Sequence, residues 1–323
     1  MFYLGVDVAK AKLDCMLLDT SNGKLKSKSI PNTAVGFVQL LEWLDKQKAV
    51  EPHVVMEPTG MYHENAALAL ADAGLVVSLV NPAQLRAFAQ GLGVKTKTDK
   101  ADSAVLARYG ATQNPASWQP PSASARRLKA LLTRRDAVAD DLQRELNRQE
   151  ANNFSPAPEA VGESIAQSIE FLKAELKRLQ KMIASHIDDD PDLRNKKELL
   201  ETIPGVGPRV SSHMTALFAG RTFERAEQLA AYLGLVPVEW QSGSSVRGRP
   251  RMSKAGPAYL RKVLYMPAVV ARRCNPHIKA LNERLLAKGK SKMAAIGAAM
   301  RKLAHLCFGV LHTGKPYDPK FAM

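Results

Sequence analysis

The sequence has little that would stabilise or anchor it outside a reducing, aqueous compartment. Its three cysteines, Cys15, Cys274 and Cys307, are odd in number and widely spaced. This spacing matches neither a disulfide framework nor a cysteine metal site. No apolar run approaches about 18 residues, and the N-terminal stretch MFYLGVDVAK has no basic n-region and no cleavage-site pattern. These absences predict a cytoplasmic protein without a membrane span, associated with the nucleoid if it binds DNA.

Acidic residues are few relative to basic ones. The chain has 46 lysines and arginines but 31 aspartates and glutamates, a formal net charge of +15 at pH 7. Such an excess usually means a polyanionic partner, either nucleic acid or an acidic membrane surface, and an ordinary basic protein is the alternative. Aromatic residues make up only 6%, which argues against extensive base stacking. The 323 residues suffice for about two domains with hydrophobic cores.

Residues 1–120 alternate between strand-like and helix-like patterns. Apolar runs predict strands at 3–9, 13–19, 25–30, 53–58 and 76–82. Helical spacing predicts helices at 34–47 and 61–74. Three strands, a helix and then a strand–helix alternation predict an α/β domain, a mixed sheet flanked by helices.

Residues 121–190 have a different pattern, because their apolar residues recur in steps of three and four. One such series is Ile165, Ile169, Leu172, Leu176, Leu179 and Ile183, and a weaker one is Leu128, Leu131, Val138, Leu142 and Leu146. The two prolines of ANNFSPAPEA separate the series. This predicts two long helices folded as a coiled-coil stalk that pairs with another copy. A helical bundle within one globule is the alternative.

Residues 191–323 predict a basic, mostly helical domain, which begins after the solvated helix end DDDPD at 188–192. The run LLETIPGVGPRVSSHMTAL, residues 199–217, places Ile-Pro-Gly-Val-Gly between two helices. This is the pattern of a helix-hairpin-helix, whose turn exposes backbone N–H groups to a phosphate. Such a contact grips the backbone of a nucleic acid without reading its sequence. A purely structural hairpin is the alternative.

Four carboxylates of the first domain stand out. Asp7 interrupts an apolar strand, where an acid is costly unless it is paired or bound to a metal. Glu57 ends the run VVME, and Asp99 and Asp102 begin a helix with a spacing that puts them on one face. Each has a plainer explanation, such as a helix N-cap at Asp99. Together they favour a magnesium site, since two such ions about 4 Å apart clamp a phosphodiester.

The loop QSGSSVRGRPRMSKAG, residues 241–256, is more basic than a linker needs to be. A serine that attacks a phosphodiester requires an exposed hydroxyl and nearby cations. The candidate nucleophiles are Ser242, Ser244, Ser245 and Ser253, and the residues alone do not choose among them. The candidate phosphate-binding cations are Arg247, Arg249, Arg251 and Lys254, joined by Lys95 and Lys97 ahead of the acidic pair. A loop that only binds the DNA backbone is the alternative.

These motifs carry a family resemblance. GVDVAK, VVMEPTG and KTDKADSAVLA, in that order, resemble the RuvC-like, Piv-related DEDD transposases of the IS110 family of bacterial insertion sequences. The segment from LAAYLGLVPVEW through the loop to YLRKVLYMPAVVA resembles the C-terminal transposase domain of that family, so nearly the whole chain is covered. The resemblance implies a ribonuclease-H-like fold, Mg²⁺ bound by Asp7, Glu57, Asp99 and Asp102, and a catalytic serine at Ser242.

The resemblance also implies a function. A transposase of this kind cuts and rejoins donor and target DNA through a covalent serine–DNA intermediate, with a non-coding bridge RNA selecting the sites. The metal would activate the serine if the two domains meet, and a dimer or tetramer is expected because strand exchange needs two DNAs. Two alternatives remain: a RuvC-like nuclease or junction resolvase that uses water, and a helix-hairpin-helix architectural protein without catalytic activity.

Overall fold

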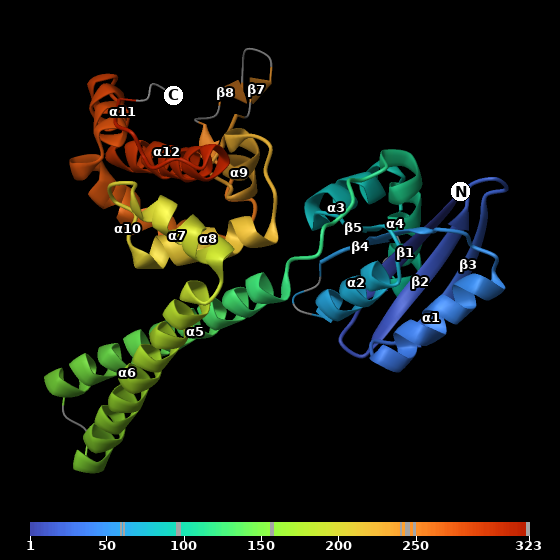
Figure 1. Ribbon diagram of the computed structural model, residues 1–323, viewed down its shortest axis with the longest axis horizontal. Coiled ribbons are helices and arrows are strands. Elements are labelled where there is room, and N and C mark those ends of the chain that lie inside the picture. The colour runs from blue at the N-terminus through green and yellow to red at the C-terminus, as the bar shows by residue number, and fades with distance from the viewer. Residues whose placement is uncertain are drawn as a thin grey trace. The chain divides into compact units, whose positions relative to one another are not determined.

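The computed structural model describes residues 1–58, 60, 62–94, 98–155, 158–239, 241–242, 246–247 and 250–320. Residues 241, 242, 246 and 247 are described by their backbone alone. The described chain forms two compact units, Met1–Pro120 and Pro121–Met323. Figure 1 shows the first unit in blue to green and the second in green to red.

The first unit is a mixed sheet with helices on both faces, as the sequence predicts. Its strands are β1 (Phe2–Val8), β2 (Lys12–Asp19), β3 (Lys24–Pro31), β4 (His53–Met56) and β5 (Val77–Leu79). Its helices are α1 (Ala34–Lys46), α2 (Tyr62–Asp72), α3 (Pro82–Gly91) and α4 (Asp99–Gln113). The strand order is β3-β2-β1-β4-β5. The first three strands are antiparallel neighbours, and β1, β4 and β5 run parallel.

Alternation along the strands gives this sheet two apolar faces. Leu4, Val6 and Leu13 belong to one buried cluster, together with residues of α1 and α2. Val55 belongs to a second cluster, which it shares with Leu85 of α3 and with residues of α4. A strand buried on both faces reads as a continuous apolar run, which explains why His53–Met56 was recognisable in the sequence.

The second unit begins with two long helices, α5 (Ala123–Phe154) and α6 (Glu159–Asp188), packed against each other as a hairpin. In α6, Ile169, Leu179 and Ile183 of the predicted series are buried. In α5 the prediction of Leu131 is wrong in detail. Leu132 is fully buried and Leu131 only half-buried, because the buried stripe runs Leu128, Leu132, Arg135, Val138.

The remaining helices form the core of the second unit. They are α7 (Pro191–Glu201), α8 (Pro208–Gly220), α9 (Ala226–Tyr232), α10 (Ala258–Cys274), α11 (Pro276–Ala287) and α12 (Lys292–Thr313). Short strands β6 (Pro237–Val238), β7 (Gln241–Ser242), β8 (Val246–Arg247) and β9 (Arg251–Met252) lie between α9 and α10. The long helix α5 also packs on α8, where Asp136 lies 3.0 Å from His213 and 3.3 Å from Arg209.

Helix α12 departs from the expectation that no segment is long and apolar enough to span a membrane. By length and composition it qualifies, but 56% of its apolar window is buried inside the unit. Leu303, Leu306 and Val310 are among its residues in the main hydrophobic cluster. This is the pattern of a core helix.

Helices α7 and α8 and the turn between them lie where the sequence predicts the helix-hairpin-helix-like segment. Ile203 and Val206 of the turn are buried, while Gly207 is exposed immediately before α8. The carbonyl of Pro204 accepts a hydrogen bond from Asn275, which is itself buried at the start of α11. The turn is therefore tied to the core on one side and leaves the first residues of α8 accessible on the other.

Candidate active site

Acidic side chains form a row across the middle strands of the first unit. In the antiparallel β1–β2 ladder, Asp7 lies directly opposite Asp14, and opposite residues present their side chains on the same face. The parallel β1–β4 ladder ends with Val6 beside Met56, so the next position on β1 is Asp7 and the next on the β4 side is Glu57. With strands about 4.8 Å apart, this register brings three carboxylates to one level of the sheet.

Helix α4 lies close over β1 because of a glycine. A Cβ atom on Gly5 would lie 2.0 Å from the carbonyl oxygen of Ser103 and 2.4 Å from the backbone nitrogen of Ala107. Any side chain at this position would therefore push the helix away from the sheet. Gly5 is two residues before Asp7 and shares its face of β1, so this contact fixes α4 next to the acidic row.

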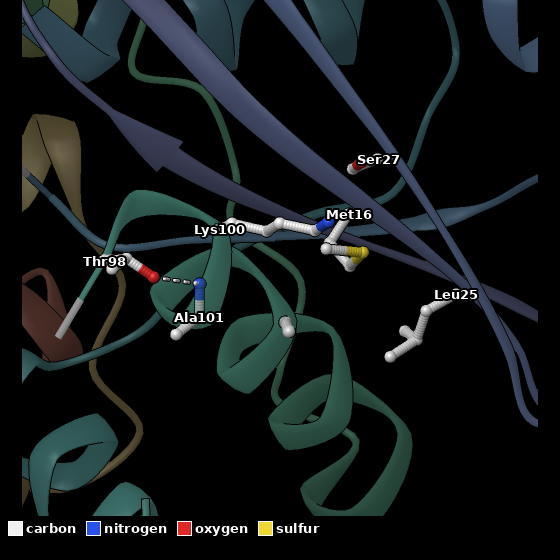
Figure 2. Close-up of a pocket in the computed structure, with 7 residues that line it drawn as sticks. Met16, Leu25, Ser27, Thr98, Lys100 and Ala101 are labelled. Carbon is white, nitrogen blue, oxygen red and sulfur yellow. Dashed lines mark hydrogen bonds between the residues drawn. The ribbon is translucent and has the colours of Figure 1, made fainter. Parts of the chain in front are cut away.

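The N-terminus of α4 brings two further carboxylates to this place. Thr98 caps the helix by accepting a hydrogen bond from the backbone N–H of Ala101 at 3.2 Å (Figure 2), and Asp99 and Asp102 lie in the first turn. Burial first, and then the negative charges of Asp102, Asp99 and Asp14, raise the pKa of Asp7 from 3.8 to about 6. The three neighbouring acids therefore add to the effect of burial in disfavouring the ionised form of Asp7.

Among the residues that the structure describes, Lys12 is the cation in contact with this acidic group. The ammonium of Lys12 contacts Asp14 at 2.8 Å and Asp99 at 2.7 Å, and so joins β2 to the first turn of α4. These contacts raise the pKa of Lys12 above its usual range and lower that of Asp99. Neither Lys12 nor Asp14 was predicted as a site residue. The only signal for them was the hairpin register, which places Asp14 opposite Asp7.

A hollow of about 400 Å³ lies beside the acidic group (Figure 2). Met16 of β2 and Leu25 and Ser27 of β3 line one side of it, and the first turns of α4 line the other. Figure 2 shows Lys100 extending from α4 toward Met16, which shares its face of β2 with Asp14. The surroundings of the acids therefore combine an apolar floor with hydroxyl groups and a cation.

The donor set suits a hard divalent cation, although its members are not drawn together around one point. Among the described residues, no group of three or more His, Cys, Asp or Glu side chains has the geometry to hold a metal ion. The chemistry nevertheless fits, because carboxylate oxygens are the ligands that Mg²⁺ prefers. The Lys12 ammonium, which contacts Asp14 and Asp99, already stands where a cation is stabilised.

In the second unit, the loop that contains Ser242 is closed at its base. We call this base the neck and define it as residues 233–238 and 251–256, and we call the loop the serine loop. Strands β6 and β9 pair across the neck, with Pro237 opposite Met252. A Cβ on Gly234 would lie 2.1 Å from the carbonyl oxygen of Ala255, and one on Gly256 would lie 1.9 Å from that of Tyr232. Both glycines have positive φ, at 69° and 85°, so the neck requires glycine twice.

Arg261 ties the two sides of this neck together. Its Nη1 atom lies within hydrogen-bonding distance of the carbonyl oxygens of Leu233 at 3.1 Å, Ala255 at 3.2 Å and Gly256 at 3.1 Å. A single guanidinium thus reaches the segment before the loop and the segment after it. Arg261 was not predicted as a site residue, because nothing in the pattern of α10 distinguishes it from a surface cation.

The predicted loop residues are described to different extents. Ser242 lies in β7, opposite Val246 of β8. Ser253 belongs to the neck, where its backbone N–H donates to the carbonyl of Val236 at 2.9 Å. Arg251 and Lys254 are exposed on the neck. Ser244, Ser245, Arg249, Lys95 and Lys97 lie outside the described residues, as does the side chain of Arg247.

Comparison with known proteins gives the class of this protein. Residues 4–152 match a family described as "Transposase", and residues 197–283 match one described as "Transposase IS116/IS110/IS902 family". The chain belongs to the IS110 family of transposases, enzymes that cut and rejoin DNA.

Individual relatives resemble the chain along its whole length. A pilin gene-inverting protein of Moraxella bovis is 34% identical over 322 residues, which is 98% of both chains. A pilin gene-inverting protein of Moraxella lacunata is 33% identical over the same length. A probable family 20 transposase of Pseudomonas aeruginosa is 29% identical over 178 residues, 52% of this chain and 51% of that one.

Proposed function

We propose that this transposase cuts and rejoins DNA through a covalent serine–DNA intermediate, with Ser242 as the nucleophile and Asp7, Glu57, Asp99 and Asp102 as magnesium ligands. The observation that carries the proposal is the meeting of acids from β1, β2 and α4, where burial and then the charges of Asp102, Asp99 and Asp14 raise the pKa of Asp7 to about 6. The strand order β3-β2-β1-β4-β5 supports a ribonuclease-H-like, RuvC-like assignment for this unit.

The neck supports the choice of Ser242 over Ser253. Ser253 is half-buried there, and its hydroxyl accepts a hydrogen bond from the backbone N–H of Ala255 at 3.4 Å. Its role is to close the neck. Ser242 lies beyond the neck, in β7, so the hydrogen bonds that close the neck do not occupy its backbone.

The proposed chemistry is a transesterification. The hydroxyl of Ser242 loses its proton, and its oxygen forms an ester bond to the scissile phosphorus. The bond between that phosphorus and a deoxyribose oxygen breaks, and the released oxygen takes up a proton. Attack by the hydroxyl of another DNA strand reverses the step and frees the serine. The phosphoester bond is conserved throughout, so rejoining needs no ATP.

Cations and carboxylates have separate tasks in this proposal. Arg251 and Lys254, exposed on the neck, would neutralise the charge that grows on the phosphate oxygens. Mg²⁺ held by the four carboxylates would lower the pKa of a bound hydroxyl and stabilise the leaving oxygen. The carboxylates of the first unit would hold that ion in place and keep weaker ligands out of the positions that they occupy around it.

In this proposal, a partner RNA rather than the protein selects the target DNA. The net charge of +15 suits two polyanionic partners, and we propose that a bridge RNA pairs with donor and target DNA while the protein binds backbones. The exposed first residues of α8 are a candidate backbone contact. Pairing of the α5–α6 hairpins between copies would give the dimer or tetramer that two DNA substrates require.

Covalent trapping tests the proposal. The purified protein is mixed with Mg²⁺, the RNA of its element and end-labelled donor and target DNA, and is then denatured. We expect a protein-linked label that is absent in Ser242→Ala and in Asp99→Ala, and that is retained in Ser253→Ala. Cleaved DNA without linked label would establish attack by water, the nuclease alternative. An absence of cleavage under all conditions would favour an architectural protein.

A further inference from the structure

The acidic group of the first unit is held together by an internal cation. On the face of the sheet covered by α4, Asp7 faces Asp14 across the β1–β2 ladder, and Asp99 and Asp102 approach from the helix. Lys12 contacts two of these acids, Asp14 and Asp99, at 2.8 and 2.7 Å. With Glu57, which follows β4 beside Asp7, the described charges here are five carboxylates and one bound ammonium.

The position of Lys12 is one that a divalent cation would also favour. Its ammonium bridges a carboxylate of the sheet and a carboxylate of the helix, which is the link that a shared metal ion makes between two elements. The side chain of Lys12 is 47% exposed and that of Asp99 is 55% exposed, so the ammonium can leave for water without unfolding its surroundings. The site therefore has one cation in place and enough carboxylates for another.

We propose that Lys12 is an exchangeable counter-ion of the metal site: it joins Asp14 to Asp99 in the metal-free enzyme and is displaced when a divalent cation binds, with Asp14 becoming a fifth carboxylate of the site. This inference rests on the magnesium site of the proposed function.

The exchange has two measurable consequences. The ammonium and the divalent cation compete for the same oxygens, so removing the ammonium strengthens metal binding. Lys12 also offsets repulsion among the acids, so removing it destabilises the protein only while metal is absent. A surface lysine without a role at the acidic group would produce neither effect.

The test measures the binding of Mn²⁺, which serves as a spectroscopic probe for Mg²⁺, to the full-length chain without DNA. Free Mn²⁺ is followed by electron paramagnetic resonance, and thermal unfolding is recorded with and without the ion. We expect Lys12→Met to lower the Mn²⁺ Kd roughly tenfold, because unit charges about 4 Å apart change an equilibrium constant by about that factor when water screens them, and these side chains are about half exposed. Lys12→Met should also lower the metal-free Tm by a few degrees, and Mn²⁺ should remove that difference.

Two further variants separate charge from contact. Lys100→Met removes the same charge from the neighbouring turn of α4, where no ion pair of Lys100 is recorded among the described residues, and should change the Kd less than threefold. Asp14→Asn in the Lys12→Met background should weaken Mn²⁺ binding again, because an amide oxygen replaces a charged ligand.

The outcomes separate this inference from the function on which it rests. Tighter binding in Lys12→Met, or binding seen only in that variant, supports the exchange. Wild-type binding with an unchanged Kd in Lys12→Met overturns the exchange and leaves the magnesium site standing. An equal effect of Lys100→Met also overturns it, because the effect would then be one of general charge. Binding by no variant overturns both the exchange and the metal site.

Discussion

Replacing Gly5 by alanine should separate the acids on the helix from those on the sheet. The new Cβ would lie 2.0 Å from the carbonyl oxygen of Ser103, and ordinary contact begins at 3.4 Å, so α4 must move by about 1.4 Å. The obstructing atoms are backbone, which cannot rotate away. Overpacking of this kind costs about 2–3 kcal/mol. Because α4 carries Asp99 and Asp102, strand transfer should fall by about 100-fold, the cost of a misplacement of about 1 Å.

Urea unfolding followed by fluorescence measures the stability cost. Trp43 and Trp118 both pack against the core of the first unit, so replacing the third tryptophan, Trp240, by phenylalanine makes the signal specific to that unit. The expected result is a transition of Gly5→Ala at lower urea than that of the parent, with an unchanged slope. Covalent trapping in the same variant measures the loss of activity.

Two other glycines provide a graded control. A Cβ at Gly110 would meet the buried side chains of Val55 at 2.7 Å and Tyr3 at 2.8 Å, so Gly110→Ala should cost about 1–2 kcal/mol, less than Gly5→Ala because side chains give way more readily than backbone. A Cβ at Gly91 would meet nothing within 4 Å, so Gly91→Ala should be neutral or stabilising by about 0.5 kcal/mol. If Gly5→Ala unfolds at the same urea concentration as Gly91→Ala, the proposed close contact of α4 with β1 is wrong.

Three further predictions follow from other parts of the molecule. Arg261→Met should speed proteolysis within the serine loop and lower strand transfer at least tenfold while DNA affinity is kept, whereas Arg261→Lys should restore part of the activity; equal proteolysis rates in the two variants and the wild type would contradict this. Asp7→Asn should stabilise the metal-free protein above pH 6 but not below about pH 4, because the folded-state pKa of about 6 exceeds the ordinary 3.8, so ionisation on raising the pH costs stability. The full pKa difference would be worth about 3 kcal/mol, and solvent screening of this half-buried group lowers the effect to about 1–2 kcal/mol, to be read from urea unfolding across pH. Leu264→Ala, a fully buried position of α10, should destabilise the second unit by about 2–5 kcal/mol without changing Mn²⁺ binding, and a smaller loss would mean that the core relaxes around the cavity.

The elements of the first unit could be predicted because local rules agree there. The runs around Val6, Leu17 and Val55 are apolar and bounded by turn residues, and each is a strand. Helix α3 was not predicted, since Asn81 and Pro82 suggested only the end of a strand. In the structure, the side chain of Asn81 caps α3 and Pro82 opens it, which is also a helix-start signal.

The sequence singles out individual acids of the candidate site but not their arrangement. Asp7 is conspicuous, because it is an acid inside an apolar strand. Asp14 is not, since it sits near the start of its strand, and only the pairing register places it opposite Asp7. Lys12 likewise could not be recognised as part of the site, because its contact is with Asp99, which is 87 positions away along the chain. Long-range register and helix placement are consequences of packing that no local pattern encodes.

The helical hairpin illustrates the same limit at smaller scale. The spacing of apolar residues predicted two long helices, and both are present. The choice between Leu131 and Leu132 depended on how α5 turns its face toward its neighbours. Asp136 lies between Arg135, Arg209 and His213, and this buried polar contact with α8 fixes the rotation of the helix about its axis.

The closed neck also affects how this enzyme can change over time. The two ends of the loop are held next to each other by Arg261, by two close-packed glycines and by the β6–β9 pair. The helices before and after the loop therefore keep their packing whatever the sequence of the loop between them. Residues 239–250 can then be lengthened, shortened or exchanged for those of a relative without repacking the core, since a longer loop with fixed ends costs little. The segment that carries the proposed nucleophile is thus an exchangeable cassette, and chimeras joined at the neck are a practical way to give this scaffold a different reactive loop.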